Sequence, residues 1–79
     1  MKVEEWGIKV TRRFERDFRK LPSNIQDRII ELVEELRNNP YLGKKLRNLP
    51  YYSLRVGDYR VIYLVDEKER IIILMTVFS

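Results

Sequence analysis

Two reactive residue types are absent from this 79-residue chain, which has no cysteine and no histidine. The lack of cysteine excludes disulfides, thiolate metal sites and cysteine nucleophiles. The lack of histidine removes the usual general base, the usual metal ligand and any catalytic triad built on imidazole. We therefore expect no metal and no cofactor, and a chemistry limited to carboxylates, lysine, arginine and tyrosine.

Long apolar runs are also missing. No stretch approaches the roughly 20 residues that span a bilayer, and the first five residues lack the apolar core of a signal peptide. The composition, 44% hydrophobic and 35% charged, is typical of one small folded domain over residues 1–79. We expect a cytoplasmic protein that does not contact a membrane.

Positive charge is concentrated in two blocks of a chain whose net charge is +4. Residues 12–20 contain Arg12, Arg13, Arg16, Arg19 and Lys20 against Glu15 and Asp17. Residues 43–60 contain Lys44, Lys45, Arg47, Arg55 and Arg60 against Asp58. Such clustering is typical of a surface that binds a polyanion, and an ordinary solvated surface is the alternative interpretation.

The first half of the chain predicts a strand followed by two helices. Residues 6–10 alternate between apolar and other side chains, which indicates a short strand. Thr11 is the expected N-cap of a first helix with Phe14, Phe18 and Leu21 on one face. After Pro22, residues 23–26 fit a capping box for a second helix, in which Ser23 caps and Gln26 reaches back. That helix should end at residues 38–40, where an asparagine could take the left-handed cap before proline.

The second half predicts a basic connector, residues 41–50, and three strands. Residues 51–56 and 59–65 flank Gly57 and Asp58, a pair that suits a type II′ hairpin turn. A last strand covers residues 70–78. The expected order is β-α-α-β-β-β, an α+β domain with a helical hairpin packed on an antiparallel sheet.

The last two predicted strands carry apolar residues on both faces, whereas two short helices can cover only one face of a sheet. An uncovered apolar face usually marks a binding surface. The alternative is that the chain curls enough to bury both faces. As the uncovered surface we predict the residues expected to share a face with Arg60, namely Ile62, Leu64, Ile72 and Leu74.

Several segments resemble the RelE/ParE toxin superfamily, the toxin halves of bacterial and archaeal toxin–antitoxin pairs. The similarity covers nearly the whole chain. It is carried by Phe14 through Lys20-Leu21-Pro22, by Asn39-Pro40-Tyr41, by Lys45-Leu46-Arg47 and above all by Tyr52-Ser53-Leu54-Arg55-Val56-Gly57-Asp58-Tyr59-Arg60-Val61-Ile62-Tyr63. The superfamily includes ribosome-dependent messenger-RNA endoribonucleases, similar to RelE, and gyrase poisons, similar to ParE.

The resemblance implies roles for particular residues. Arg60 matches an active-site arginine of the RelE-like nucleases, and Arg47 matches a residue that contacts RNA. Tyr51 and Ser53 stand in the segment where those nucleases carry lysines, and the family's terminal basic residue and tyrosine would fall beyond Ser79.

We therefore expect a RelE-like toxin that cleaves ribosome-bound messenger RNA and is neutralised by a RelB-like antitoxin. We expect contact with operator DNA only indirectly, through that antitoxin. The expected catalytic residues are Arg60 and Arg55, because an arginine fork can pair with two phosphate oxygens. Alternation leaves open whether the two arginines share a face. Lys44, Lys45 and Arg47 are the expected RNA-binding residues. The alternatives are a ParE-like gyrase inhibitor, an inactive module that only binds an antitoxin, and a basic interaction module unrelated to toxicity.

Overall fold

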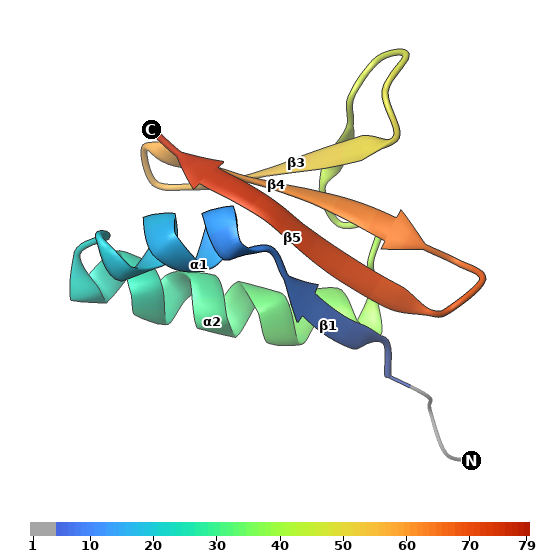
Figure 1. Cartoon of the computed structure of the whole chain (residues 1–79), viewed down its shortest axis with the longest axis horizontal. Helices are drawn as coiled ribbons and strands as arrows, with labels where there is room; N and C mark the ends of the chain where they lie inside the picture. Colours follow the sequence, from blue (N-terminus) through green and yellow to red (C-terminus); the bar gives the residue numbers. More distant parts are fainter. Residues whose placement is uncertain (1–4) are drawn as a thin grey trace.

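The computed structural model describes residues 5–79 and confirms the α+β class and the predicted order of elements (Figure 1). The elements are β1 (Gly7–Val10), α1 (Arg12–Arg19), α2 (Ser23–Asn38), β2 (Lys44–Lys45), β3 (Tyr51–Val56), β4 (Tyr59–Asp66) and β5 (Ile71–Phe78). The two-residue strand β2 is an addition to the predicted order. It was missed because two consecutive lysines show no apolar alternation, although lysine is common on the edge of a sheet.

The five strands form one mixed sheet in the order β1-β5-β4-β3-β2. Strands β2 to β5 pair antiparallel, whereas β1 lies parallel to β5. The sequence analysis predicted an antiparallel sheet, and the parallel pairing of β1 with β5 departs from that prediction. Parallel neighbours need a long connection, and here the helices and the other three strands provide it.

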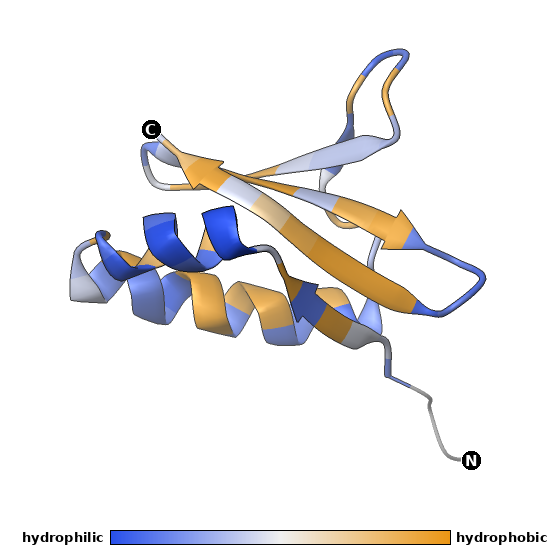
Figure 2. Ribbon diagram, in the orientation of Figure 1, coloured by the Kyte–Doolittle hydropathy of each residue, from blue (hydrophilic) through white to orange (hydrophobic). Residues whose placement is uncertain are grey.

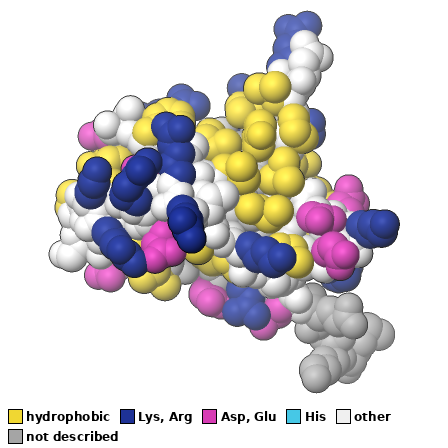
Figure 3. Space-filling view, in the orientation of Figure 1, with side chains coloured by type: hydrophobic (Ala, Val, Ile, Leu, Met, Phe, Trp, Pro, Cys, Tyr) yellow, Lys and Arg dark blue, Asp and Glu magenta, His cyan; other side chains and the backbone are white. Residues whose placement is uncertain are grey.

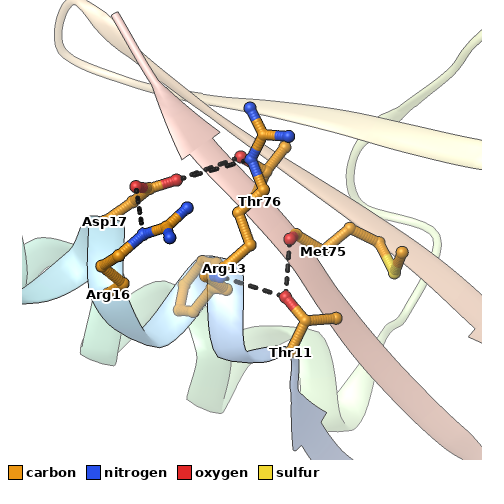
Figure 4. Close-up of polar contacts among 7 residues, drawn as sticks. Thr11, Arg13, Arg16, Asp17, Met75 and Thr76 are labelled. Atoms are coloured by element: carbon orange, nitrogen blue, oxygen red, sulfur yellow. Dashed lines mark hydrogen bonds and ion pairs between the residues drawn. The ribbon is translucent and has the colours of Figure 1, made fainter.

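Helix α1 begins as predicted. The Thr11 side chain accepts a hydrogen bond from the backbone N–H of Phe14 at 3.0 Å, which is the expected N-cap. The same hydroxyl donates to the Met75 carbonyl at 2.7 Å, and the Thr76 hydroxyl lies 3.5 Å from a carboxylate oxygen of Asp17. These contacts fasten α1 to the second half of β5 (Figure 4).

The predicted capping box at the start of α2 is wrong. Pro22 occupies the N-cap position, and no side chain caps the helix. Gln26 instead donates from Nε2 to the Phe18 carbonyl at 2.8 Å, so it satisfies the end of α1 and ties the two helices together. Asn39 ends α2 with a φ of −147°, an extended conformation rather than the left-handed one expected.

Both helices lie on one side of the sheet and bury their apolar stripes there (Figures 1 and 2). Helix residues Phe14, Ile29 and Leu36 are at most 4% exposed, and they belong to the same core as Val61 and Tyr63 of β4. The β3–β4 turn has a φ of 59° at Gly57, the positive value that a type II′ turn requires at this position. Among residues 5–79, no helix is long and apolar enough to cross a membrane.

A β-bulge changes which residues of β5 face the helices. Phe78 pairs with Arg60 and Thr76 with Ile62, but the next pair is Leu74 with Tyr63, so Met75 is an extra residue. Alternation counted back from Phe78 therefore reverses at Met75. Ile72 and Leu74 fall on the helix side, where they are 0% and 2% exposed. Their predicted place on the uncovered face with Arg60 is wrong.

Candidate functional site

A basic groove of about 700 Å³ opens between the segment around β2 and the ends of β3 and β4 that meet at their turn. Its lining residues are Leu42, Gly43, Lys44, Lys45, Leu46, Arg47, Ser53, Leu54, Arg55 and Arg60. All five residues predicted for catalysis or RNA binding are among them. Their roles stay predictions, but the fold does bring the whole set together.

Arg55 and Arg60 lie directly opposite each other on neighbouring antiparallel strands. Opposite residues of such a pair point to the same face, which answers the question that alternation left open. Both side chains are exposed. Arg55 donates from Nε to the Gly57 carbonyl at 3.0 Å, and none of the ion pairs found among residues 5–79 includes either arginine. Like charges directly opposite destabilise a sheet, so this pair forms a ready site for an anion.

The two lysines of β2 differ in direction. Lys44 pairs with Ser53, which shares the face of Arg55, so Lys44 lies on the same face of the sheet as the arginine pair. Lys45 pairs with Tyr52 and therefore starts on the opposite face, and its ammonium group donates to the Leu49 carbonyl at 2.7 Å. Lys44 is therefore better placed than Lys45 to act together with the arginines.

A buried tyrosine holds the segment that carries these cations. Tyr63 is 0% exposed, and its hydroxyl donates to the Pro40 carbonyl and accepts from the Gly43 N–H, both at 2.8 Å. Burial raises the pKa of this hydroxyl above its ordinary value, and the hydrogen bond from Gly43 acts in the opposite direction. No pattern in the sequence indicates this role, because Tyr63 is expected only to be a core aromatic residue.

Gly43 allows this close approach. A Cβ atom at this position would lie 2.7 Å from Tyr63 Oη and 2.9 Å from the Ser53 carbonyl oxygen. No side chain other than hydrogen fits there without movement of the segment, so the position of β2 depends on this glycine.

The groove offers guanidinium groups, ammonium groups and the Ser53 hydroxyl, with no carboxylate in its lining. Such a set binds and neutralises phosphate, because arginine pairs with two oxygens at once and lysine acts as a point charge. It has no group that ordinarily titrates near neutral pH. Catalysis here would therefore depend on charge stabilisation and on accurate placement of the substrate.

Next to the groove lies the sheet face that no helix covers. Ile62 and Leu64 share this face with Arg60, as predicted, and both are half-buried. Leu64 pairs with Ile73, and Arg60 pairs with Phe78, which is 47% exposed. Ile73 and Phe78 therefore occupy the places that the sequence had assigned to Ile72 and Leu74.

Comparison with known proteins gives consistent matches. A family model described as "ParE toxin of type II toxin-antitoxin system, parDE" matches residues 8–79. Toxin RelE of Mycobacterium tuberculosis is 42% identical over 66 residues, covering 78% of this chain and 68% of that protein. Putative toxin RelE1 of Methanocaldococcus jannaschii is 30% identical over 76 residues, covering 89% of this chain and 84% of that protein.

Solved structures share the fold. The toxin–antitoxin complex RelBE2 of Mycobacterium tuberculosis contains a chain that matches with a TM-score of 0.85 and 28% identity, covering 92% of this chain and 95% of that chain. The archaeal RelE–RelB complex of Pyrococcus horikoshii matches with a TM-score of 0.80 and 26% identity, covering 92% of each chain.

Proposed function

The chain belongs to the ParE toxin family of type II toxin–antitoxin systems, and on this premise we propose that it cleaves messenger RNA on the ribosome at its basic groove. It is a type II toxin, and its relatives include a protein named Toxin RelE. That likeness and the predicted match of Arg60 to the RelE-like active-site arginine support a ribonuclease that inhibits translation.

The observation that carries the proposal is that Arg55 and Arg60 lie opposite each other in the groove and take part in none of the ion pairs found among residues 5–79. In RNA cleavage the 2′-hydroxyl gives its proton to water, its oxygen attacks the neighbouring phosphorus atom to form a 2′,3′-cyclic phosphate, and the bond to the 5′-oxygen breaks. Negative charge grows on the phosphoryl oxygens as the transition state forms. Two guanidinium groups on one face would stabilise that charge, and Lys44, predicted to bind RNA and lying on the same face, would donate the proton that the leaving 5′-oxygen needs.

The groove has no imidazole and no carboxylate, so its residues provide weak acid–base catalysis at neutral pH. Rate must come from holding the 2′-oxygen, the phosphorus and the 5′-oxygen in line. A ribosome that already holds the message in a fixed conformation supplies this alignment. The proposed dependence on the ribosome follows from the lack of acid–base groups in the groove. A toxin that acts on ribosomes would be located in the cytoplasm.

A RelB-like antitoxin would neutralise the toxin on the uncovered sheet face. Ile62 and Leu64 present apolar surface immediately beside Arg60. An antitoxin segment that folds on this surface removes it from water and at the same time blocks the groove, so binding and inhibition are one event. The structural relatives that contain RelB support such a partner. Contact with operator DNA would then be made by the antitoxin.

The test is cleavage of a message on purified ribosomes, read by primer extension. The wild-type chain should cut ribosome-bound message and leave free message intact. Arg60→Gln should lose at least about a hundredfold in rate, the usual effect of removing one group that stabilises transition-state charge. Lys68→Gln, which removes an exposed cation from the turn between β4 and β5, is the matched control and should keep full activity.

The family model also covers ParE, which keeps a gyrase inhibitor as the alternative function. A DNA supercoiling assay with purified gyrase separates the two. Loss of supercoiling at protein concentrations that leave ribosome-bound message uncut would replace the proposed function with the alternative one.

A further inference from the structure

One aromatic and two basic side chains form a row across the uncovered face of the sheet. Arg60 of β4 pairs with Arg55 of β3 on one side and with Phe78 of β5 on the other. Paired residues of antiparallel strands point to the same face, and neighbouring strands lie about 5 Å apart. The phenyl ring is therefore one strand away from Arg60 and two strands away from Arg55.

Phe78 is more open to solvent than its apolar neighbours on this face. Figure 3 shows hydrophobic side chains gathered over the strands, clear of the helices. Ile62, Leu64 and Ile73 are half-buried, whereas Phe78 is 47% exposed. None of the ring–ring and cation–π contacts found among residues 5–79 includes Phe78. Its ring is therefore available to a flat partner from outside.

The core of the protein does not use the Phe78 ring. Val77, the residue before it, faces the helices and is 3% exposed. Phe78 belongs neither to the core nor to the partly buried residues that pack against the core. A single exposed hydrophobic residue is ordinary in a folded protein, so exposure alone gives Phe78 no role. Its position is what distinguishes it, because it directly adjoins the arginine pair of the groove.

A nucleotide matches this row in its chemistry. Its phosphate carries the negative charge that guanidinium groups bind, and its base is a flat ring joined to that phosphate through one sugar. Aromatic side chains hold single-stranded bases by stacking, and they accept any base because every base has a π-face. Phenylalanine has no hydrogen-bonding group in its side chain, so Phe78 would hold a base without reading its identity.

Holding the base would supply what the groove lacks. Two arginines can bind a phosphate but leave the nucleotide free to turn about it, whereas cleavage depends on keeping the attacking oxygen, the phosphorus and the leaving oxygen in line. We propose that Phe78 stacks on the base of a nucleotide beside the cleaved bond and so positions the phosphate against Arg55 and Arg60. This inference rests on the proposed function, because it takes messenger RNA as the substrate.

The test measures message cleavage on purified ribosomes by three variants. Phe78→Leu keeps an apolar side chain and removes the aromatic ring, and Phe78→Trp restores a ring. The matched control is Ile30→Ala, which truncates a residue of α2 that is 54% exposed and does not line the groove. A calorimetric Tm verifies that each variant is folded. Each protein is assayed on an intact message and on messages with an abasic ribonucleotide on one or the other side of the cleaved bond.

On the intact message Phe78→Leu should reduce kcat/KM by about 5- to 150-fold, the range expected for the loss of one stacked base. Phe78→Trp should be as active as wild type, and Ile30→Ala should stay within about twofold of it. On one of the two abasic messages wild type and Phe78→Leu should cleave at equal rates, because no base remains to stack.

Two results would overturn the proposal. One is full activity of Phe78→Leu on the intact message, and the other is a loss in Phe78→Leu that persists on both abasic messages. If Phe78→Leu weakens antitoxin binding and leaves cleavage unchanged, Phe78 belongs to the antitoxin surface and the proposal is wrong.

A binding measurement without cleavage separates failure of this inference from failure of the proposed function. The probe is a short single-stranded oligonucleotide that carries the fluorescent base 2-aminopurine and has deoxyribose in place of ribose, so it cannot be cut. Stacking on Phe78 should quench its fluorescence, and Phe78→Leu should lose most of this quenching. No quenching by wild type, or quenching that survives Phe78→Leu, refutes only the stacking proposal. Quenching that depends on Phe78, without any cleavage of ribosome-bound message, refutes only the ribonuclease proposal.

Discussion

Replacing Tyr63 with phenylalanine should damage both the stability of the fold and the groove, although the hydroxyl is remote from any substrate. The hydroxyl makes two hydrogen bonds of 2.8 Å, to the Pro40 carbonyl and from the Gly43 N–H, and the tyrosine is fully buried. Each such bond contributes about 0.5–1.5 kcal/mol net, so Tyr63→Phe should lower the free energy of unfolding by about 2 kcal/mol. In a domain of this size that loss lowers Tm by about 10 °C.

Urea unfolding followed by Trp6 fluorescence measures this change. Tyr59→Phe is the matched control, because the Tyr59 hydroxyl makes none of the hydrogen bonds found among residues 5–79, and it should change stability by less than about 0.5 kcal/mol. RNA affinity should fall for Tyr63→Phe because the segment that carries Lys44 loses its two attachments. Equal stability of the two variants would refute the reasoning.

The raised pKa of Tyr63 adds a prediction about pH. The folded state holds the proton more tightly than the unfolded chain, in which tyrosine titrates near 10. The contribution of this group is therefore fully present below about pH 10 and is lost as the pH rises toward the folded-state pKa. Wild type should lose stability in this alkaline range more steeply than Tyr63→Phe.

Three further changes have expected outcomes. Lys44→Ser combined with Arg47→Ser should reduce the log–log salt slope of single-stranded RNA binding by about 1.4, measured by fluorescence anisotropy; an unchanged slope would mean that both residues only keep the protein in solution. Gly43→Ala should lower Tm and weaken the same binding, because its methyl group meets Tyr63 and a backbone carbonyl. A calorimetric Tm equal to wild type would contradict this. Ile62→Ser with Leu64→Ser should reduce the affinity for the antitoxin, measured by isothermal titration calorimetry, far more than the free energy of unfolding, measured by urea denaturation. Similar losses in both quantities would place these residues in the core instead.

Local patterns were sufficient to predict much of this fold. The Thr11 cap, the apolar stripes of the helices and the Gly57 turn each depend on residues within a few positions of one another. The basic groove was also largely predictable, because its five cations come from one charged stretch that folds back on itself through a two-residue turn.

Contacts between distant segments were not predictable in this way. The alternating residues of β5 give no sign of the bulge at Met75. The Met75 carbonyl accepts a hydrogen bond from the hydroxyl of Thr11, which lies near the other end of the chain. One extra residue in a strand reverses the faces to which all earlier side chains of that strand point. For this reason Ile72 and Leu74 lie in the core and not on the uncovered face. Gln26 likewise fitted a local capping pattern, but the carbonyl of Phe18 in the preceding helix is its partner.

The most direct test of the central claim is a double-mutant cycle on Arg55 and Arg60, with the rate of message cleavage on purified ribosomes as the measurement. If both guanidinium groups stabilise charge on one phosphate, Arg55→Gln and Arg60→Gln should each reduce the rate by about 10²–10³. The double variant should then be little slower than either single variant, because residues that act as a unit are strongly non-additive. Effects that multiply, or full activity in either single variant, would show that the opposed arginines of the groove do not form one catalytic site.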